Sequence, residues 1–349
     1  MDKDFVKKAL KDLTSLYAIP SYEKSVKDYI VKNLKGTRAT IEVNNLGCLT
    51  VEFEGKSPKK GKIMMDAHMD EVGFVVQYVD KNGFLRIVGY GNIDARVVPS
   101  QKLLVHSSSG KIFDGVVGML PPHVTAGKEA TVIPVDQLYV DCGFKSDVEV
   151  EKAGIRVGSM VTFPANFTEL MNGRISSKAL DDRVGCAVLL ALGKHLHNNI
   201  TERNIVLSFS VQEEGGLKGI ASVVQKVKPE YALVLECTTA CDVPGVSDEK
   251  KVAKMGAGVA FTISDNTGYI LPETVDHLIK TAKAKKIKYQ IKTPRFGGTN
   301  AGALYGAYEG VKTGIVAVPS RYIHSPVSVC EWSDVFAMFD FAKAYSKSL

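Results

Sequence analysis

Residue types that bind divalent metal ions recur along this chain of 349 residues, mostly where a predicted strand ends. A two-metal hydrolase needs such a set: imidazoles, carboxylates on each ion, one bridging carboxylate, and a spare carboxylate that moves protons. No single motif is specific, but their joint occurrence at strand ends is hard to obtain by accident. The motifs are His68-Met69-Asp70, Asp181-Asp182, Glu213-Glu214, Glu236 and Tyr322-Ile323-His324.

The first motif follows a buried strand that we predict at residues 62–67. Asp70 lies two residues after His68, so in an extended chain the two side chains point the same way. Asp70 can then accept the second imidazole N–H and fix the tautomer of a metal-binding His68. A His–Asp hydrogen bond without a metal is an equally good interpretation of this motif alone.

The first acidic pair, Asp181-Asp182, precedes a helix predicted at residues 183–197. Acidic residues there are typical of an N-cap and a first helical turn, which is the favoured interpretation of the pair alone. In the metal interpretation, Asp181 is a bridging ligand.

The second acidic pair, Glu213-Glu214, follows an apolar strand predicted at residues 205–211 and precedes two glycines. Adjacent carboxylates repel each other unless a cation or a shared proton intervenes. The glycines suit a close approach of backbone to ligand. An acidic loop ahead of a helix is the alternative, but it does not explain why both glutamates directly follow so apolar a strand.

The last two candidates lie at another strand and in a turn. Glu236 ends the strand predicted at residues 231–236, where a partly buried carboxylate needs a cation or several donors. His324 lies in a turn closed by Ser325-Pro326, and taken alone it is an ordinary loop histidine.

The elements that position these residues form an α/β pattern. After Pro164 helices and strands alternate, which predicts a mostly parallel sheet flanked by helices, with sites beyond the carboxyl ends of its strands. Residues 72–164 are instead strand-rich and interrupted by glycines, which predicts an inserted β domain. Residues 1–71 and 165–349 would form the catalytic domain. We expect its second helix at residues 22–34, with Ser21 as the N-cap.

Composition excludes several classes of protein. The net charge is +6, but the basic residues are dispersed, and the densest cluster, at residues 280–288, is typical of a solvated helix end rather than a nucleic-acid site. No apolar run approaches the roughly 20 residues of a membrane span. The N-terminus is unlike a signal peptide, and the six cysteines form no disulfide framework. We therefore expect a cytoplasmic protein that binds neither nucleic acid nor membrane.

Together the motifs resemble the M42 family of metal-dependent aminopeptidases, within the zinc-peptidase superfamily. The matching stretches span almost the whole chain in the family's order, with a β insertion after the first motif. The resemblance implies that His68 and Glu236 hold one metal, that Glu214 and His324 hold the other, and that Asp181 bridges them. It also implies that Glu213 is the general base, that Asp70 orients His68, and that the Asp181–Asp182 peptide bond is cis. The stretches are residues 66–73, 179–183, 212–214, Glu236 with 242–245, and 322–326.

The resemblance further implies dimers that assemble into a tetrahedral dodecamer, largely through the inserted domain. His123, in the loop Pro121-Pro122-His123 of that domain, matches a family segment that could reach a neighbouring subunit's site. Two residues depart from the family pattern: Glu236 stands where some members have Asp, and Asn300 where Asp is expected in many. Neither the role of Asn300 nor the preferred N-terminal residue of the substrate follows from the sequence.

The favoured hypothesis is a hydrolase that removes the N-terminal residue from short peptides with two divalent ions, Zn²⁺ or Co²⁺, which the sequence does not distinguish. A glycoside hydrolase is an alternative because some family members carry endoglucanase labels. Glycosidases use two carboxylates without metal and usually aromatic sugar platforms, whereas this chain has one tryptophan. A non-catalytic, metal-stabilised scaffold is a second alternative, against which the surplus carboxylate of Glu213 argues.

Overall fold

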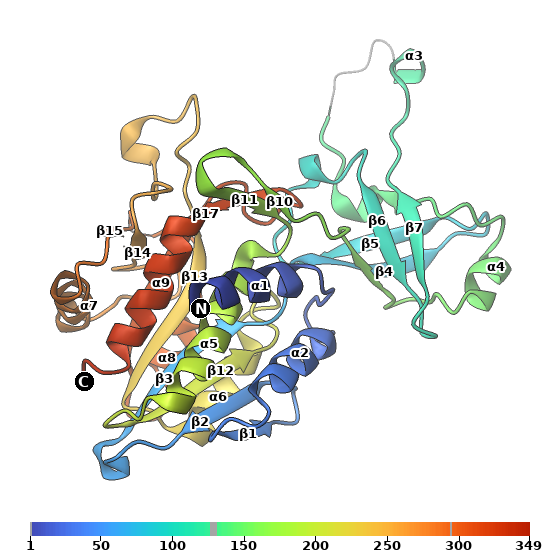
Figure 1. The fold of residues 1–349 in the computed structure, drawn as a ribbon. Helices are drawn as coiled ribbons and strands as arrows, with labels where there is room; N and C mark the ends of the chain where they lie inside the picture. Colours follow the sequence, from blue (N-terminus) through green and yellow to red (C-terminus); the bar gives the residue numbers. More distant parts are fainter. Residues whose placement is uncertain (1, 126–130, 294) are drawn as a thin grey trace.

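A mixed eight-stranded sheet forms the centre of the larger part of the molecule (Figure 1). The computed structural model describes residues 2–125, 131–293 and 295–349. In sheet order the strands are β1 (Thr40–Val43), β2 (Leu49–Phe53), β12 (Asn204–Ser210), β3 (Lys62–His68), β13 (Tyr231–Thr239), β16 (Lys312–Ser320), β14 (Val259–Phe261) and β15 (Tyr289–Ile291). The central strands β12, β3, β13 and β16 pair in parallel and are almost entirely buried, because helices cover both of their faces.

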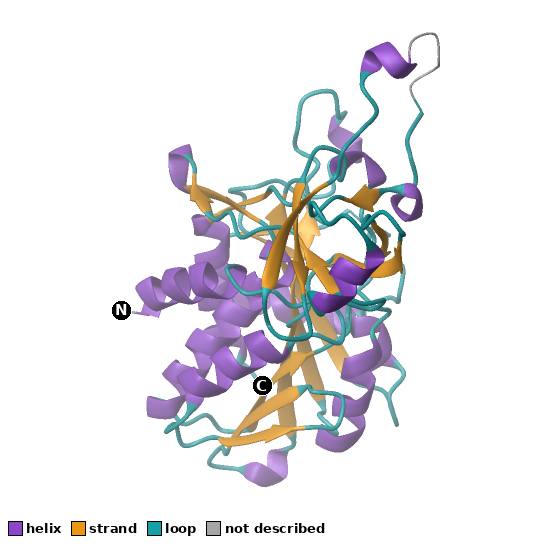
Figure 2. Cartoon of the chain, turned by 90° about the vertical axis from the view of Figure 1, so that its right-hand side faces the viewer, coloured by secondary structure: helices purple, strands orange, loops and turns teal. Residues whose placement is uncertain are grey.

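Helices lie on both sides of this sheet (Figure 2). The longest, α5, is apolar around most of its circumference, because it lies between β3 and β13 on one side and α1 and α9 on the other. The mixed α/β fold class predicted from the sequence is thus confirmed. The helices of this part are α1 (Asp2–Thr14), α2 (Lys24–Leu34), α5 (Leu180–Asn198), α6 (Lys218–Val227), α7 (Pro272–Ala284), α8 (Ala301–Tyr305) and α9 (Trp332–Tyr345), with short 3₁₀ turns at Pro58–Lys60, Met171–Gly173 and Asp248–Lys250.

The predicted cap of the second helix is wrong. Helix α2 begins at Lys24, and Glu23, not Ser21, occupies the N-cap position. Ser21 has a positive φ of 74° and lies in the turn before the helix. The Glu23 carboxylate accepts hydrogen bonds from the backbone amides of Ser21 (2.9 Å) and Gln212 (3.0 Å), so this turn is held against the loop that carries Glu213.

A second, six-stranded sheet extends to one side of the first (Figure 1). Its buried side chains, between residues 74 and 163, form a hydrophobic cluster separate from that of the large sheet. In sheet order its strands are β7 (Ile112–Val116), β6 (Lys102–His106), β9 (Met160–Thr162), β4 (Gly73–Val79), β5 (Leu85–Tyr90) and β8 (Tyr139–Val140). The same segment contains α3 (Pro122–Thr125), α4 (Asp147–Lys152) and 3₁₀ turns at Ala95–Val97 and Val135–Gln137.

A small third sheet joins the segment before α5 to the segment before α9. It contains β10 (Thr168–Glu169), β11 (Arg174–Ser177) and β17 (Ser328–Glu331), paired antiparallel. Within the described parts of the chain, every helix is too short or too polar to cross a bilayer.

A buried ionic cluster holds the two large sheets and α5 in place. The Glu71 carboxylate, between β3 and β4, accepts hydrogen bonds from Lys178 Nζ (2.8 and 2.9 Å) and from Arg183 Nη2 (3.3 Å). All three side chains are at most 3% exposed. Because Lys178 and Arg183 flank Asp181 and Asp182 along the chain, this cluster fixes the backbone from which those aspartates project.

Replacing Glu71 with glutamine is expected to lower the free energy of unfolding by about 3–5 kcal/mol, because two buried cations would lose their counter-ion. Urea denaturation followed by circular dichroism measures this change. Asp28→Asn is the control: it breaks the exposed Lys24–Asp28 pair and should cost less than about 1 kcal/mol. Equal losses in the two variants would contradict the argument from burial.

Candidate functional site

One carboxylate lies between two imidazoles near the ends of the central strands. His68, at the end of β3, has its Nε2 atom 3.3 Å from Asp181 Oδ1. His324, in the turn between β16 and β17, has its Nε2 atom 3.3 Å from Asp181 Oδ2. Each oxygen of Asp181 therefore faces a different imidazole, so this carboxylate is shared by the two histidines.

The start of α5 has an irregular backbone at the two aspartates. Asp181 and Asp182 lack helical φ and ψ angles although they lie within the first turn of α5. The peptide bond between them is cis, as the family resemblance implied.

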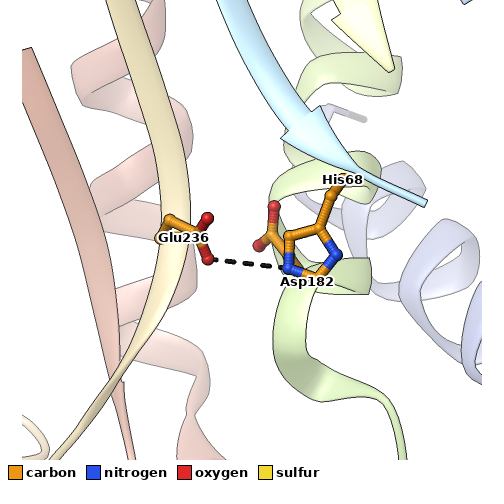
Figure 3. Close-up of side chains that lie close together, drawn as sticks. All are labelled: His68, Asp182 and Glu236. Carbon is orange, nitrogen blue, oxygen red and sulfur yellow. Dashed lines mark ion pairs between the residues drawn. The ribbon is translucent and has the colours of Figure 1, made fainter. Parts of the chain in front are cut away.

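On the side of His68, the structure gathers two further carboxylates (Figure 3). Glu236 Oε2 lies 3.7 Å from His68 Nε2, and the Asp182 carboxylate lies close to both. Glu236 is inside β13, not at its end as predicted, because β13 continues its parallel pairing with β16 as far as Thr239.

Asp182 is a residue of the site that the sequence interpretation did not assign. Its Oδ1 atom accepts a hydrogen bond from the backbone amide of Gly185 (2.9 Å), so it also caps the first turn of α5, as the alternative interpretation of this pair suggested. In the sequence, only its position directly after Asp181 indicated that Asp182 could belong to the site.

On the side of His324, the second carboxylate is that of Glu214. Glu214 Oε1 lies 3.2 Å from His324 Nε2. The other ring nitrogen, Nδ1, lies 2.9 Å from the backbone carbonyl oxygen of Asn92, which can accept its proton and leave Nε2 free as a ligand. Asn92 belongs to the β-rich segment, so this segment takes part in shaping the site.

Asp70 contacts both His68 and the loop of the two glutamates. Its backbone carbonyl oxygen lies 3.0 Å from His68 Nδ1, whereas its carboxylate oxygen Oδ1 is 3.6 Å from the same atom. The two carboxylate oxygens accept hydrogen bonds from the backbone amides of Glu213 (3.1 Å) and Glu214 (3.0 Å). One residue thus orients the imidazole through its backbone and positions the glutamate loop through its side chain.

The electrostatics of the site show an excess of buried carboxylates. Burial, reinforced by Glu214 and Asp181 and opposed by His68, raises the pKa of Glu213 to about 8. Burial also raises the pKa of Glu236 well above its usual range. Burial alone would lower the pKa of His324, but hydrogen bonds with Asp181 and Glu214 outweigh it and raise that pKa to about 11.

Unpaired oxygen atoms indicate what these carboxylates lack. In the described chain, Glu236 Oε1 and Asp182 Oδ2 are buried without a hydrogen-bond partner. Buried charged oxygens are costly unless they are paired or coordinate metals. The donor set of imidazoles and carboxylates therefore fits divalent cations such as Zn²⁺ or Co²⁺.

The other sequence candidates lie outside this cluster. Asn300 Nδ2 donates hydrogen bonds to Asp66 Oδ2 and Ser210 Oγ, both at 2.8 Å, among buried residues of the large sheet. His123 is exposed on α3, which stands at the tip of an arm of the six-stranded sheet and is helical where a loop was expected (Figure 1).

Known proteins resemble this chain over almost its whole length. A family model described as M42 glutamyl aminopeptidase matches residues 47–341. The lysyl aminopeptidase of Pyrococcus furiosus is 31% identical over 97% of this chain and 96% of its own length. An aminopeptidase structure from the archaeon Desulfurococcus kamchatkensis is 35% identical, with a TM-score of 0.95 over 99% of this chain and 96% of its own. The TET1 peptidase of Pyrococcus horikoshii, described as assembling into a tetrahedron or a large octahedral shell, is 29% identical, with a TM-score of 0.89 over 99% of this chain and 100% of its own.

Sequence match and shared fold both extend over nearly the whole length of the chain, well beyond the candidate site. The chain therefore belongs to the M42 family of aminopeptidases and is a peptide hydrolase.

Proposed function

We propose that this chain removes the N-terminal residue from short peptides with two divalent ions, Zn²⁺ or Co²⁺, held by its own imidazoles and carboxylates. The observation that carries the proposal is the Asp181 carboxylate, which has one oxygen directed at each of two imidazoles. His68 and Glu236 would hold one ion, Glu214 and His324 the other, and Asp181 both. The unpaired Glu236 Oε1 atom supports this assignment.

Glu213 would act as the general base. A pair of divalent ions supplies Lewis acidity, which makes water a stronger acid and polarises a carbonyl group. In our assignment Glu213 is not a ligand, so its carboxylate can take a proton from the attacking water and deliver it to the amine that leaves. Asp70 would place this carboxylate, because it holds the backbone amides of Glu213 and Glu214.

Aminoacyl p-nitroanilides, assayed after loading with Zn²⁺ or Co²⁺, test this function. We expect hydrolysis that chelation abolishes and metal restores, with about two ions per chain when fully loaded. N-acetylated versions of the same substrates are the control, since an aminopeptidase requires the free amine. Activity that survives complete metal removal, or equal hydrolysis of the acetylated substrates, would refute the proposal.

We further propose that residues 72–164 form an oligomerisation domain, within which residues 126–130 lie outside the described chain. The arm around α3 exposes several apolar side chains to water, which is unfavourable in free energy. Their exposed fractions are 48–63%, for Met119, Leu120, Val124 and Val132. A second subunit could bury them, first in a dimer and then in a tetrahedral dodecamer. Enclosure of the sites in such a shell would restrict substrates to short, unfolded peptides.

Light scattering on the metal-loaded protein should then give the mass of a dodecamer of 37.8 kDa chains. Leu120→Glu combined with Val124→Glu should yield smaller species, because charges would occupy the apolar arm. Met171→Glu is the matched control: its side chain is 82% exposed but lies outside the arm, so assembly should be retained. A stable monomer of the unaltered chain with full peptidase activity would contradict both the assembly and the size selection.

The preferred N-terminal residue does not follow from family membership. The family description names glutamyl substrates, whereas the relative from Pyrococcus furiosus is called a lysyl aminopeptidase. Opposite charges are thus compatible with the same fold, and the side chains beside the metal centre must decide between them.

A further inference from the structure

Two acidic side chains from distant parts of the chain hold three consecutive backbone amides of the loop that carries Glu213. Glu23 accepts a hydrogen bond from the amide of Gln212 through its Oε1 atom (3.0 Å). The two carboxylate oxygens of Asp70 accept hydrogen bonds from the amides of Glu213 (3.1 Å) and Glu214 (3.0 Å). The loop is therefore anchored from outside at each of these three positions, and the first anchor is Glu23.

Gln212 has a backbone conformation that needs such an anchor. Its φ angle is 58°, in the left-handed region that residues other than glycine rarely adopt. Such a conformation persists only where surrounding contacts impose it. The turn before α2 supplies two of them: Glu23 accepts the amide hydrogen of Gln212, and Ser21 Oγ accepts a hydrogen bond from Gln212 Nε2 (3.1 Å). These contacts fix the direction in which the chain enters Glu213.

The turn before α2 is itself fixed to the buried ionic cluster around Glu71. The Ala18 amide donates a hydrogen bond to Glu71 Oε1 (3.2 Å), and the Ala18 carbonyl oxygen accepts one from the Glu71 amide (2.8 Å). Within the turn, Glu23 Oε1 also accepts a hydrogen bond from the Ser21 amide (2.9 Å), and Glu23 is only 5% exposed. Glu23 thus connects a rigid part of the fold to the glutamate loop.

The anchoring function of Glu23 does not depend on a full negative charge. Burial, reinforced by the Asp70 carboxylate, raises the pKa of Glu23 to about 7. A single oxygen, Oε1, accepts both amide hydrogens, and an uncharged carbonyl oxygen can accept them as well. Glutamine at position 23 would keep such an oxygen and alanine would not, so the two substitutions separate the hydrogen bond from the charge.

Glu213 depends on its backbone more than the proposed metal ligands do. A ligand such as Glu214 is held both by the loop and by its ion, and its carboxylate also lies 3.2 Å from His324 Nε2. Glu213 is not a ligand in the proposed assignment, and among the described residues none donates a hydrogen bond to its carboxylate. The position of this carboxylate therefore follows from the position of the loop.

We propose that Glu23 is a positioning residue for peptide hydrolysis: through the amide of Gln212 it holds the loop in the place from which Glu213 reaches the attacking water. This inference rests on the proposed function, in which Glu213 is the general base. A misplacement of a reacting group by 1 Å can lower a rate by about 10²-fold. Loss of the Glu23 hydrogen bond should therefore lower kcat while the metal ligands keep their ions.

Steady-state kinetics of metal-loaded variants on an aminoacyl p-nitroanilide test this role. For Glu23→Ala we expect kcat to fall by about 10–10²-fold, with little change in KM and unaltered metal content. Glu23→Gln keeps the acceptor oxygen and should retain most of kcat. Glu42→Ala is the matched control: it breaks the exposed pair of Glu42 with Lys226 on the far edge strand β1 and should leave kcat unchanged. Equal losses of kcat in Glu23→Ala and Glu23→Gln would contradict the hydrogen-bond argument.

A double-mutant cycle shows whether Glu23 acts through Glu213. If it does, adding Glu23→Ala to Glu213→Gln should lower kcat no further, because the group that Glu23 positions is already inactive. A residue that merely supports the fold would lower kcat by the same factor in both backgrounds. Additive effects would therefore overturn the proposal.

Hydrogen–deuterium exchange followed by mass spectrometry provides a readout that does not depend on turnover. The peptide covering residues 205–216 should exchange faster in Glu23→Ala than in the unaltered protein, whereas Glu23→Gln should match the unaltered protein. Unchanged exchange in Glu23→Ala would show that Glu23 does not hold the loop and would overturn the proposal.

The possible failures are distinguishable. If the unaltered enzyme hydrolyses no aminoacyl substrate, the proposed function is wrong and the role of Glu23 falls with it. If the enzyme is active but Glu23→Ala keeps its full kcat, or loses its metal together with its activity, the aminopeptidase stands and the role of Glu23 is wrong.

Discussion

Replacing Glu213 with glutamine is expected to lower kcat by about 10²–10⁴-fold, the usual contribution of a positioned general base. Glutamine keeps the shape of the side chain but cannot accept the proton of the attacking water. Because Asp70 holds the loop through the backbone amides of Glu213 and Glu214, the substitution should leave the loop in place. Steady-state kinetics together with metal analysis measure both quantities.

Glu214→Gln is the informative comparison. Its carboxylate lies 3.2 Å from His324 Nε2 and would be a ligand, so this variant should lose metal as well as activity. If Glu213→Gln lost its metal while Glu214→Gln kept it, the two roles would have to be exchanged.

Replacing Asp181 with alanine is expected to abolish activity and remove both ions, because this carboxylate is the group shared by the two imidazoles. His68→Ala should lose at least the ion that His68 and Glu236 would hold, and its activity with it. Metal analysis of the purified variants after dialysis, followed by peptidase assay, measures both effects.

A histidine outside the site provides the control for these variants. His195 lies in the last turn of α5, away from the carboxylates of the centre, and His195→Ala should keep full metal content and activity. A His68→Ala protein with full metal content and full activity would disprove the assignment of His68.

The sequence by itself determined the fold class and most residues of the cluster, but not Asp182. The alternation of helices and strands after Pro164 predicted a mostly parallel sheet flanked by helices, and the structure pairs β12, β3, β13 and β16 in parallel. Since such strands bring their carboxyl ends to one edge, residues far apart in sequence, such as His68 and Glu236, were expected to meet. His68 Nε2 lies 3.7 Å from Glu236 Oε2, while their roles in metal binding stay predictions.

The length and caps of individual elements depended on partners that periodicity does not reveal. Glu236 lies inside β13 because the pairing with β16 continues beyond it. Ser21 is not the helix cap, because Glu23 occupies the N-cap position. The Glu23 carboxylate there accepts a hydrogen bond from the backbone amide of the distant Gln212. In both places, a contact across many residues outweighed the local preference.

Only the tertiary structure decided which polar groups support the site and which lack a partner. The Asp70 carboxylate reaches amides 143 and 144 residues away, and the Asn92 carbonyl group reaches His324 across 232 residues. In the sequence, Glu236 is one glutamate among many, because its type does not reveal that its Oε1 atom is buried without a hydrogen-bond partner in the described chain. Such contacts arise from packing between distant segments, and a pattern of neighbouring residues carries no information about them.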